Sequence, residues 1–331
     1  MLSAMTVLVT GATGFVMANL VRHLAGIGSD VVAVDRKPPD DPLRQFLEGK
    51  RGRVRFRDVD VTDRAAVEAL AREVRPERAV HGAALTPIPP DAERARFLET
   101  CSVNVTGTLN VLAALAEVGA GRVVAVSSGS VYGRRHDLSP IAEDEAKDPQ
   151  ALYPMTKWAA DMLARRFAEV HAINVAVARL ASPFGPFERD TGSRPLLSPI
   201  AYWAEAALRS DPVIISGDPT YRRDVIYVDD VASGIAAILF AGRLSHDAYN
   251  VGWGRGTSSE ETVTALARLV PGLAIEWRRA EPSPWLGAGN AARGPLICDR
   301  LRQDLGWEPR YDLDSGLSEY VNWLRRRPSP T

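Results

Sequence analysis

Cysteine is scarce in this chain of 331 residues, which contains only Cys101 and Cys298. Two cysteines this far apart in the sequence are too few for a disulfide framework or a zinc-binding motif. We therefore expect no metal site, and a protein of the reducing cytoplasm.

An excess of one charge and a long apolar run are also missing. The 40 Lys and Arg residues nearly balance the 41 Asp and Glu residues, giving a formal net charge of -1. No overall field therefore attracts nucleic acid or an anionic membrane. The longest apolar segment, near residues 231–241, is too short to span a bilayer. We expect a soluble protein with neither a nucleic-acid nor a membrane partner.

Hydrophobic residues make up 46% of the sequence, enough for a substantial core. Short apolar runs alternate with amphipathic segments through the first half of the chain. Because parallel strands need crossover connections, this alternation predicts an α/β fold, a doubly wound parallel sheet with helices on both faces. The sequence does not give the order of the strands. We expect them near Val7, Val31, Val54, Ala79, Val123 and Val175.

The first strand runs into a glycine-containing turn, Val7-Leu-Val-Thr-Gly-Ala-Thr-Gly-Phe-Val-Met17. Strand, tight turn and helix in this order begin a dinucleotide-binding Rossmann unit, in which Gly11 and Gly14 let the backbone approach a pyrophosphate. About twenty residues later, Asp35 closes the second strand, where a carboxylate accepts hydrogen bonds from an adenosine ribose. The pattern has a third glycine where this chain has Met17, and such turns also occur without a ligand. The turn residues expected to contact the cofactor are Gly11, Thr13, Gly14, Phe15 and Val16.

Acidic residues also follow the third strand. Asp60, with Val61 beside it, is placed to accept a hydrogen bond from an adenine amino group at the carboxyl edge of the sheet. A helix N-cap formed with Thr62 or Asp63 explains the aspartates equally well. Both interpretations stay open.

The segment after the fourth strand has small side chains. Ala83 and Ala84 leave room for the middle of a dinucleotide, so we expect them in the cofactor site. Thr86 opens a proline-rich loop over the same edge of the sheet. This loop either shapes a substrate pocket, with Thr86 in contact with the substrate, or only connects two elements.

Tyr153 and Lys157 begin an amphipathic segment about twenty residues after Ser127-Ser128 and the fifth strand. Residues four apart lie on the same face of a helix, so the phenol and the ammonium would point the same way. A tyrosine followed four residues later by a lysine is common by chance, and the pair alone is weak evidence.

Together these features resemble the extended short-chain dehydrogenases/reductases of the NAD-dependent epimerase/dehydratase family. The resemblance spans nearly the whole chain in the family's order. It rests on Gly11-Ala-Thr-Gly14, Asp35, Asn104-Val-Thr-Gly-Thr108, Ser127-Ser128, Tyr132-Gly133, Tyr153-x-x-x-Lys157, Arg223-Asp-Val-Ile-Tyr-Val-Asp-Asp230 and Leu305-Gly-Trp-Glu-Pro309.

The resemblance implies a division of the chain into two parts. Residues 1–179, joined by 223–241, would form the NAD-binding Rossmann domain. The smaller, C-terminal substrate-binding region would comprise residues 180–222 and 242–331.

The resemblance also implies roles in hydride transfer. Tyr153 would be the acid/base, Lys157 its activator and the anchor of a cofactor ribose, and Ser128 the hydrogen-bond partner of the reacting oxygen, while Asn104 would belong to the cofactor site. A free tyrosine has a pKa of about 10 and is a poor base at neutral pH. Lowering that pKa by roughly three units corresponds to about 4 kcal/mol, within reach of nearby cations.

Gly129 and Ser130 narrow the reaction, because relatives that eliminate water or lose a carboxylate resemble one another in having an acid there. Dehydratase and decarboxylase chemistry is therefore disfavoured. We expect a nucleotide-sugar epimerase, similar to UDP-sugar 4-epimerases, working through a keto intermediate. An NAD-dependent dehydrogenase or reductase of a small sugar, sugar acid or other hydroxy compound is the alternative. A cofactor-binding protein without catalysis, suggested by Met17, is a second alternative.

By resemblance, Arg223 would clamp a substrate diphosphate; an ion pair with Asp229 or Asp230 is the alternative. Ser182, another expected substrate contact, stands where the family often has Asn. A later arginine-containing segment that completes the clamp in relatives has no clear match within residues 283–294. These departures keep a small hydroxy compound open as the substrate.

Two further expectations concern the cofactor and the assembly. Asp35 repels a ribose 2′-phosphate, although Arg36 and Lys37 follow it, so we expect NAD rather than NADP. By resemblance, helices near residues 94–117 and 153–170 would pair with a second copy in a four-helix bundle, making a homodimer.

Overall fold

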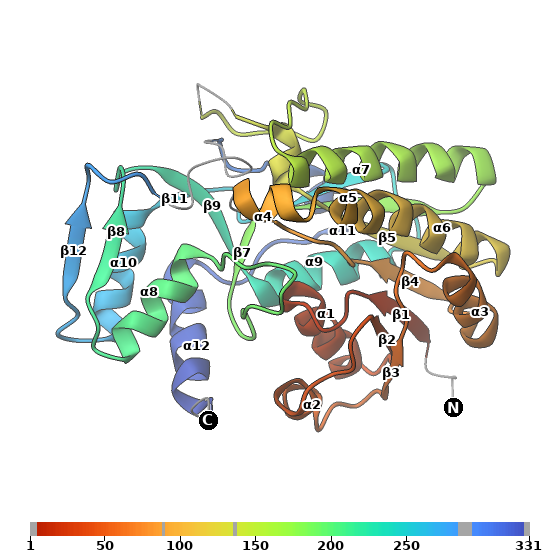
Figure 1. The fold of residues 1–331 in the computed structure, drawn as a ribbon, viewed down its shortest axis with the longest axis horizontal. Helices are drawn as coiled ribbons and strands as arrows, with labels where there is room; N and C mark the ends of the chain where they lie inside the picture. Colours follow the sequence, from red (N-terminus) through yellow and green to blue (C-terminus); the bar gives the residue numbers. More distant parts are fainter. Residues whose placement is uncertain (1–4, 88–89, 135–137, 284–292, 328–331) are drawn as a thin grey trace.

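The structure is a computed structural model that describes residues 5–87, 90–134, 138–283 and 293–327 (Figure 1). Its main sheet has seven parallel strands in the order β10-β6-β5-β4-β1-β2-β3. The expected doubly wound α/β fold is confirmed, with all six expected strands present. The strands are β1 Thr6–Thr10, β2 Asp30–Asp35, β3 Val54–Asp58, β4 Arg78–His81, β5 Arg122–Ser128, β6 Val175–Leu180 and β10 Ala248–Val251.

Both faces of this sheet are buried, which explains the continuous apolar runs of its strands. In β1, Val7 and Val9 pack into the core on one face, whereas Leu8 between them packs into the core on the other. The first face is covered by the helices α1 Phe15–Gly26, α2 Asp41–Leu47, α9 Val228–Phe240 and α11 Asp299–Leu305. The second face is covered by α3 Arg64–Val74, the π-helical turn η1 Ser102–Thr106, α6 Gly107–Glu117 and α7 Leu152–His171.

Two short helices, α4 Pro90–Ala95 and α5 Phe97–Cys101, lead into η1 and α6. The helix expected near residues 94–117 is thus interrupted, whereas the one expected over 153–170 is the continuous α7. A 3₁₀ turn, η2 Gly129–Tyr132, follows β5 directly.

A smaller region lies at one end of the main sheet, on the left of Figure 1. Its own core includes Phe184, Trp203, Tyr227 and Tyr320. Its elements are β7 Ser182–Phe184, α8 Pro199–Leu208, β8 Val213–Ser216, β9 Arg222–Tyr227, β11 Gly256–Ser258, α10 Ser259–Leu269, β12 Ile275–Arg278 and α12 Leu313–Arg326.

The chain passes between the two regions several times. Helix α9, within the segment expected to return to the larger domain, packs against α1. Strand β10 lies within residues 242–331, which we assigned to the smaller region, yet it pairs with β6 in the main sheet. Strand β9 lies in the segment assigned to the larger domain, yet it joins β7 and β11 in the smaller sheet.

Met17, which replaces the third glycine of the cofactor motif, is buried between α1 and the end of β4, with only 3% of its surface exposed. Gly82 follows β4, and a Cβ atom built there would lie 2.3 Å from Met17 Sδ and 2.5 Å from its Cγ. The side chain at position 17 therefore fills space that the glycine after β4 leaves open. This complementary pair makes the methionine compatible with the fold.

We predict that Gly82→Ala lowers the free energy of unfolding by about 1–3 kcal/mol, because the added methyl overpacks the Met17 site. Urea denaturation would measure the change. In a Met17→Ala background the same substitution should cost much less, because the larger side chain is gone. Gly26→Ala is the control, since a Cβ there meets no atom within 4 Å. An equal cost of Gly82→Ala in both backgrounds would contradict the pairing.

Candidate active site

A cavity at the carboxyl edge of the main sheet extends into the smaller region. All but one of the site residues predicted from the sequence line it, and the exception is Asn104. The predicted residues in the wall are Gly11, Thr13, Gly14, Phe15, Val16, Asp35, Asp60, Val61, Ala83, Ala84, Thr86, Ser128, Tyr153, Lys157, Ser182 and Arg223.

The glycine turn approaches the end of β4 closely. Gly11 has a φ of +73°, and a Cβ there would lie 2.7 Å from the backbone N and Cα of Ala83. Gly14 precedes α1 in an extended conformation, and no side chain caps this helix. The N–H groups of the first turn of α1 therefore remain available to an anion, as a pyrophosphate requires. These features fit a bound dinucleotide.

Asp35 is held in place beside the glycine turn. Its Oδ2 accepts hydrogen bonds from the backbone N–H of Thr13 at 3.0 Å and from the Thr13 hydroxyl at 2.8 Å. Its Oδ1 accepts from the backbone N–H of Arg36 at 2.8 Å. The carboxylate is therefore oriented before a ribose arrives.

The two open interpretations of the aspartates after β3 apply to different residues. The N-cap of α3 is Asp63, which accepts from the Ala66 N–H at 3.0 Å. Asp60 Oδ1 accepts from the N–H and the hydroxyl of Thr62, both at 2.8 Å, and Asp60 also lines the cavity. Asp60 therefore holds a turn and also lies in the cavity wall.

Tyr153 and Lys157 lie in the first turns of α7. The Tyr153 side chain is half-buried and hydrogen-bonds the side chains of Ser128 and Thr86. Burial raises the pKa of Tyr153, while these two hydrogen bonds and the cations of Arg194 and Arg293 lower it. Lys157 is only 4% exposed, and burial lowers its pKa to about 8, opposed by Asp161.

Ser128 ends β5 and is held by the turn that follows it. Its hydroxyl oxygen accepts from Ser130 N–H at 3.1 Å and from the Ser130 hydroxyl at 2.9 Å. Gly129 has little room for a side chain, because a Cβ would lie 3.1 Å from Leu296 and 3.2 Å from the Leu180 carbonyl oxygen. The segment after Ser128 therefore supplies a hydroxyl and a glycine, and no acid.

A buried chain of hydrogen bonds lies beneath the cavity. The Thr108 hydroxyl donates to the Asn104 carbonyl at 2.7 Å, and Thr108 Oγ1 lies 3.0 Å from His81 Nε2. His81 Nδ1 lies 2.8 Å from Thr10 Oγ1, which also accepts from the N–H of Gly82 at 3.2 Å. Burial and the charge of Lys157 lower the pKa of His81 to about 3, so the ring is neutral. The network assigns its proton to Nε2.

Asn104 continues this chain toward α7. Its amide exchanges hydrogen bonds with the backbone of Leu85 and donates to Thr156 Oγ1 at 2.9 Å. The Thr156 hydroxyl donates to the Tyr153 carbonyl oxygen at 2.9 Å. Asn104 is 1% exposed and does not line the cavity, so it positions the Tyr153 segment from below.

Arginines line the far part of the cavity. Arg223 comes from β9, and burial lowers its pKa to about 10, with the neighbouring cations Arg293 and Arg194 acting in the same direction. Burial also lowers the pKa of Arg293. The stretch 283–294, which gave no clear match for a second clamp residue, thus brings Arg293 beside Arg223. Our sequence interpretation missed this arginine.

The two acids considered as alternative partners of Arg223 are bound by other groups. Asp229 forms an ion pair with Arg22 at 2.5 Å. Asp230 accepts from the N–H groups of Arg310 at 3.0 Å and Tyr311 at 2.9 Å. Both carboxylates are therefore engaged elsewhere.

Asp224 anchors the segment that carries Arg293. Its carboxylate accepts from the N–H groups of Trp253 at 2.9 Å and Leu296 at 2.9 Å. Burial raises the pKa of Asp224 to about 6, and the backbone donors oppose this rise. The neighbour of Arg223 in sequence therefore holds Arg293 in place.

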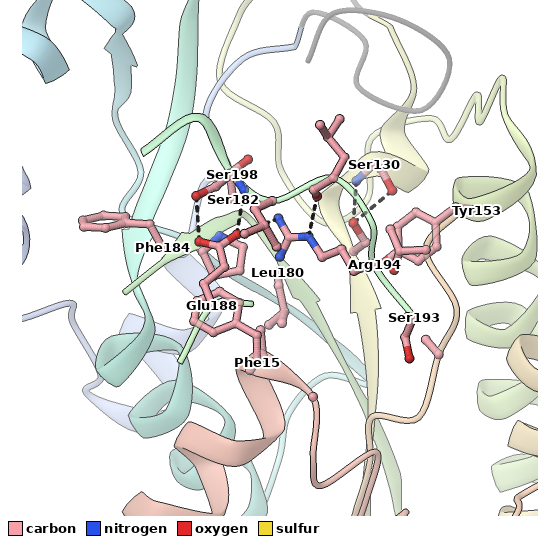
Figure 2. A pocket seen from close by; sticks show the side chains of 18 of the residues that line it. Phe15, Ser130, Tyr153, Leu180, Ser182, Phe184, Glu188, Ser193, Arg194 and Ser198 are labelled. Atoms are coloured by element: carbon pink, nitrogen blue, oxygen red, sulfur yellow. Dashed lines mark hydrogen bonds and ion pairs between the residues drawn. The ribbon is translucent and has the colours of Figure 1, made fainter. Parts of the chain in front are cut away.

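Glu188 and Arg194 are further residues that sequence analysis missed, because no motif contains them. Glu188 accepts from the N–H and the hydroxyl of Ser198, both at 2.7 Å, and pairs with Arg194 at 3.2 Å. Figure 2 shows the Arg194 side chain between Glu188 and Tyr153, above Phe15. The Arg194 guanidinium lies 6.0 Å from the centre of the Phe15 ring.

Two expectations about metals and membranes can be compared with the part of the chain that is described. Over those residues, no cluster of three or more His, Cys, Asp or Glu is placed to hold a metal ion. None of the helices described is both long and apolar enough to cross a bilayer.

Comparison with known proteins gives consistent matches. The model of the NAD dependent epimerase/dehydratase family matches residues 7–252. The chain is 30% identical to a UDP-glucose 4-epimerase of Mycolicibacterium smegmatis, over 98% of this chain and 99% of that protein. It is 27% identical to a probable dTDP-glucose 4,6-dehydratase of Sinorhizobium fredii, over 96% of this chain and 92% of that protein.

Solved structures agree with these matches. A UDP-glucose 4-epimerase of Thermotoga maritima, solved with UDP-glucose, is 26% identical with a TM-score of 0.83, over 97% of this chain and 99% of that chain. MoeE5, solved with UDP-glucuronic acid and NAD, is 30% identical with a TM-score of 0.80 and the same coverage. The chain therefore belongs to the NAD-dependent epimerase/dehydratase family and is an NAD-dependent enzyme of the extended short-chain dehydrogenase/reductase type.

Proposed function

We propose that this enzyme is a nucleotide-sugar 4-epimerase acting on a UDP-sugar through a keto intermediate. The main support for the proposal is the set of groups that line one cavity. It joins a dinucleotide cradle, the group Ser128, Tyr153 and Lys157, and the arginines Arg223 and Arg293. The relatives that bind or convert UDP-sugars support this substrate class.

Tyr153 acts as the acid/base. As a phenolate it takes the proton of the sugar 4-hydroxyl while that carbon loses hydride, which leaves a 4-keto sugar. When bound, NAD supplies a reversible hydride acceptor. Ser128 donates a hydrogen bond to the reacting oxygen. Tyr153 returns the proton to that oxygen once the same carbon has regained the hydride on its opposite face.

Lys157 makes this chemistry accessible near neutral pH. A positive charge on the same helix face favours the phenolate of Tyr153 and opposes the rise in pKa that burial causes. The ammonium also donates hydrogen bonds to a cofactor ribose. Because the pKa of Lys157 is about 8 in the structure without ligands, an added phenolate would favour its charged form.

The diphosphate of the substrate accounts for the arginines at the far end. Arg293 lies close enough to Arg223 for its charge to add to the lowering of the Arg223 pKa by burial, an arrangement that two phosphate charges would stabilise. A neutral sugar offers no charge to these two half-buried guanidinium groups, and a sugar acid offers one negative charge where a nucleotide diphosphate offers two. The nucleotide-sugar interpretation is therefore preferred over the dehydrogenase alternative.

Epimerisation is preferred over dehydration because of the acids in the cavity. Among the described wall residues, Asp35 and Asp60 lie at the cofactor end, and Glu188 is bound by Ser198 and Arg194. Asp218 accepts from the N–H and hydroxyl of Thr220. None of these acids belongs to the segment after Ser128, where an acid serves elimination in relatives.

The first test is conversion of UDP-glucose and UDP-glucuronic acid with added NAD, followed by proton NMR and by absorbance in the reduced-nicotinamide band. We expect the C4 epimer to form without net NADH. Tyr153→Phe should lower the rate at least about a hundredfold, because it removes the acid/base, while NADH binding persists. Tyr202→Phe, at a side chain 43% exposed, is the control and should be fully active.

Other outcomes of this assay separate the alternatives. Steady accumulation of NADH with a free sugar, sugar acid or other hydroxy compound would replace the epimerase with a dehydrogenase. Binding of NADH with no turnover of any substrate would favour a non-catalytic protein.

Arg293 gives a second test, with UDP as the probe. Arg293→Gln should weaken UDP binding about tenfold, the effect of losing one charge-assisted contact, as measured by calorimetry with NADH present. Arg166→Gln changes a guanidinium that is 72% exposed on α7 and should leave UDP affinity unchanged. Equal affinities of the Arg293 and Arg166 variants would remove Arg293 from the substrate site.

We also propose that the enzyme is a homodimer. Helices α5 and α7 pack together and expose apolar side chains, Phe97 50%, Leu98 82%, Met155 48%, Met162 44%, Leu163 39% and Val170 60%. Positions 155, 162 and 163, and 170 recur every seven or eight residues, so they share one face of α7. A second copy with the same face would bury this surface in a four-helix bundle.

Light scattering at micromolar concentration tests the dimer. The unmodified protein should be a dimer, and the double variant Leu98→Glu, Met162→Glu a monomer, because it would bury four charges across the symmetric interface. Ile27→Glu is the control, at an apolar side chain that is 54% exposed after α1. A monomeric unmodified protein would refute the proposal.

A further inference from the structure

The cofactor site contains a cation that the NAD-binding pattern does not require. Arg36 follows Asp35 at the end of β2, and both residues line the cavity. Near a ribose, an arginine at such a place accommodates a 2′-phosphate, whereas an aspartate opposes one. Asp35 therefore favours NAD, whereas Arg36 beside it favours NADP. The carboxylate of Asp35 alone does not determine which of the two cofactors binds.

The Arg36 side chain is engaged by a distant acid. Its Nη1 lies 2.9 Å from Oε1 of Glu99, which belongs to α5 and is 63 residues away in sequence. The side chains of the pair are 35% and 42% exposed. This contact uses one guanidinium nitrogen, Nη1, from which a phosphate would otherwise accept, and it places a negative charge beside the arginine.

Glu99 is itself fixed from the opposite side. Arg96 donates to Glu99 Oε2 from Nε at 2.8 Å and to Oε1 from Nη2 at 3.0 Å. Arg96 also donates to the carbonyl of Gly192 in the segment between β7 and α8. Hydrogen bonds from Arg96 and Arg36 lower the pKa of Glu99 to about 2, so it is ionised at any physiological pH. The Glu99 carboxylate beside Arg36 therefore stays ionised, and Arg96 holds it in place.

We propose that Glu99 is a cofactor-specificity residue, which keeps Arg36 from binding a ribose 2′-phosphate and thereby completes the selection of NAD by Asp35. Asp35 from β2 and Glu99 from α5 then both act against a phosphate at the ribose 2′ position. Asp35 repels the phosphate directly, and Glu99 binds the guanidinium of Arg36, which would attract it. The proposal rests on NAD dependence and is independent of the sugar that the enzyme converts.

The test is a fluorescence titration of NADH and NADPH into the full chain without any sugar. In an Asp35→Ser background, adding Glu99→Gln should strengthen NADPH binding about tenfold, the value of one charge-assisted contact, with NADH affinity changed less than about twofold. The gain should shrink at high salt, since the released arginine is partly exposed.

A third substitution assigns the gain to Arg36. In an Asp35→Ser, Arg36→Gln background, Glu99→Gln should no longer improve NADPH binding. This variant also separates Arg36 from Lys37, which stays in place throughout. Glu73→Gln is the matched control, because it releases Arg57 from an exposed pair of the same length, 2.9 Å.

The outcomes that overturn the proposal are distinct. An unchanged NADPH affinity on adding Glu99→Gln would make the pair an ordinary surface contact. A parallel change in both coenzymes would indicate a general effect on the fold, and a gain that persists without Arg36 would assign selection to another cation. Because no sugar is present, none of these results bears on the epimerase proposal, and failure of the epimerase assay would leave this one intact.

Discussion

The hydrogen-bonded chain from Thr10 through His81, Thr108 and Asn104 to Thr156 is the constraint on which the site depends. It joins the ends of β1 and β4 to η1, α6 and the first turn of α7. Every group in it is buried, so a missing partner would leave a polar atom without compensation, a cost of about 1–3 kcal/mol. The glycine cradle follows the first of these residues, and the last is hydrogen-bonded to the backbone of Tyr153. The interior of the fold thereby fixes the glycine turn and the Tyr153 segment relative to each other.

Much of the larger domain could be predicted from the sequence because its strands are buried on both faces. Runs such as Asp30-Val-Val-Ala-Val-Asp35 need no partner to be recognised. Strand β10 was missed for a physical reason, since it has four residues and one of them is Asn250. That side chain is fully buried and satisfied by Tyr132 and by the carbonyls of Ile141 and Ile297. A polar residue whose partners lie more than a hundred positions away, as Tyr132 and Ile141 do, gives no local signal of a buried strand.

The site residues that were predicted have local sequence signals, whereas those that were missed depend on contacts with distant residues. The glycine turn, Asp35 and the Tyr153 to Lys157 spacing belong to single elements, so their geometry follows from local structure. Arg293 instead reaches the cavity because Asp224, from β9, binds the backbone at Leu296. Arg194 and Glu188 come from the irregular segment between β7 and α8, whose position depends on contacts with Thr86 and Arg96. Long-range contacts determine these positions, and one sequence does not reveal them.

The two departures from the cofactor motif have the same form. Met17 conflicts with the local rule of a third glycine, and the space it needs is found at Gly82, directly after β4. Arg36 conflicts with the preference expressed by Asp35, and its charge is matched by Glu99, on another helix. In each case a residue that does not suit the local motif is accommodated by one residue far away in the sequence. This agrees with the expectation that local sequence preferences and tertiary packing favour the same structure. A departure from a motif is therefore evidence against its function only after the residues packed against it have been identified.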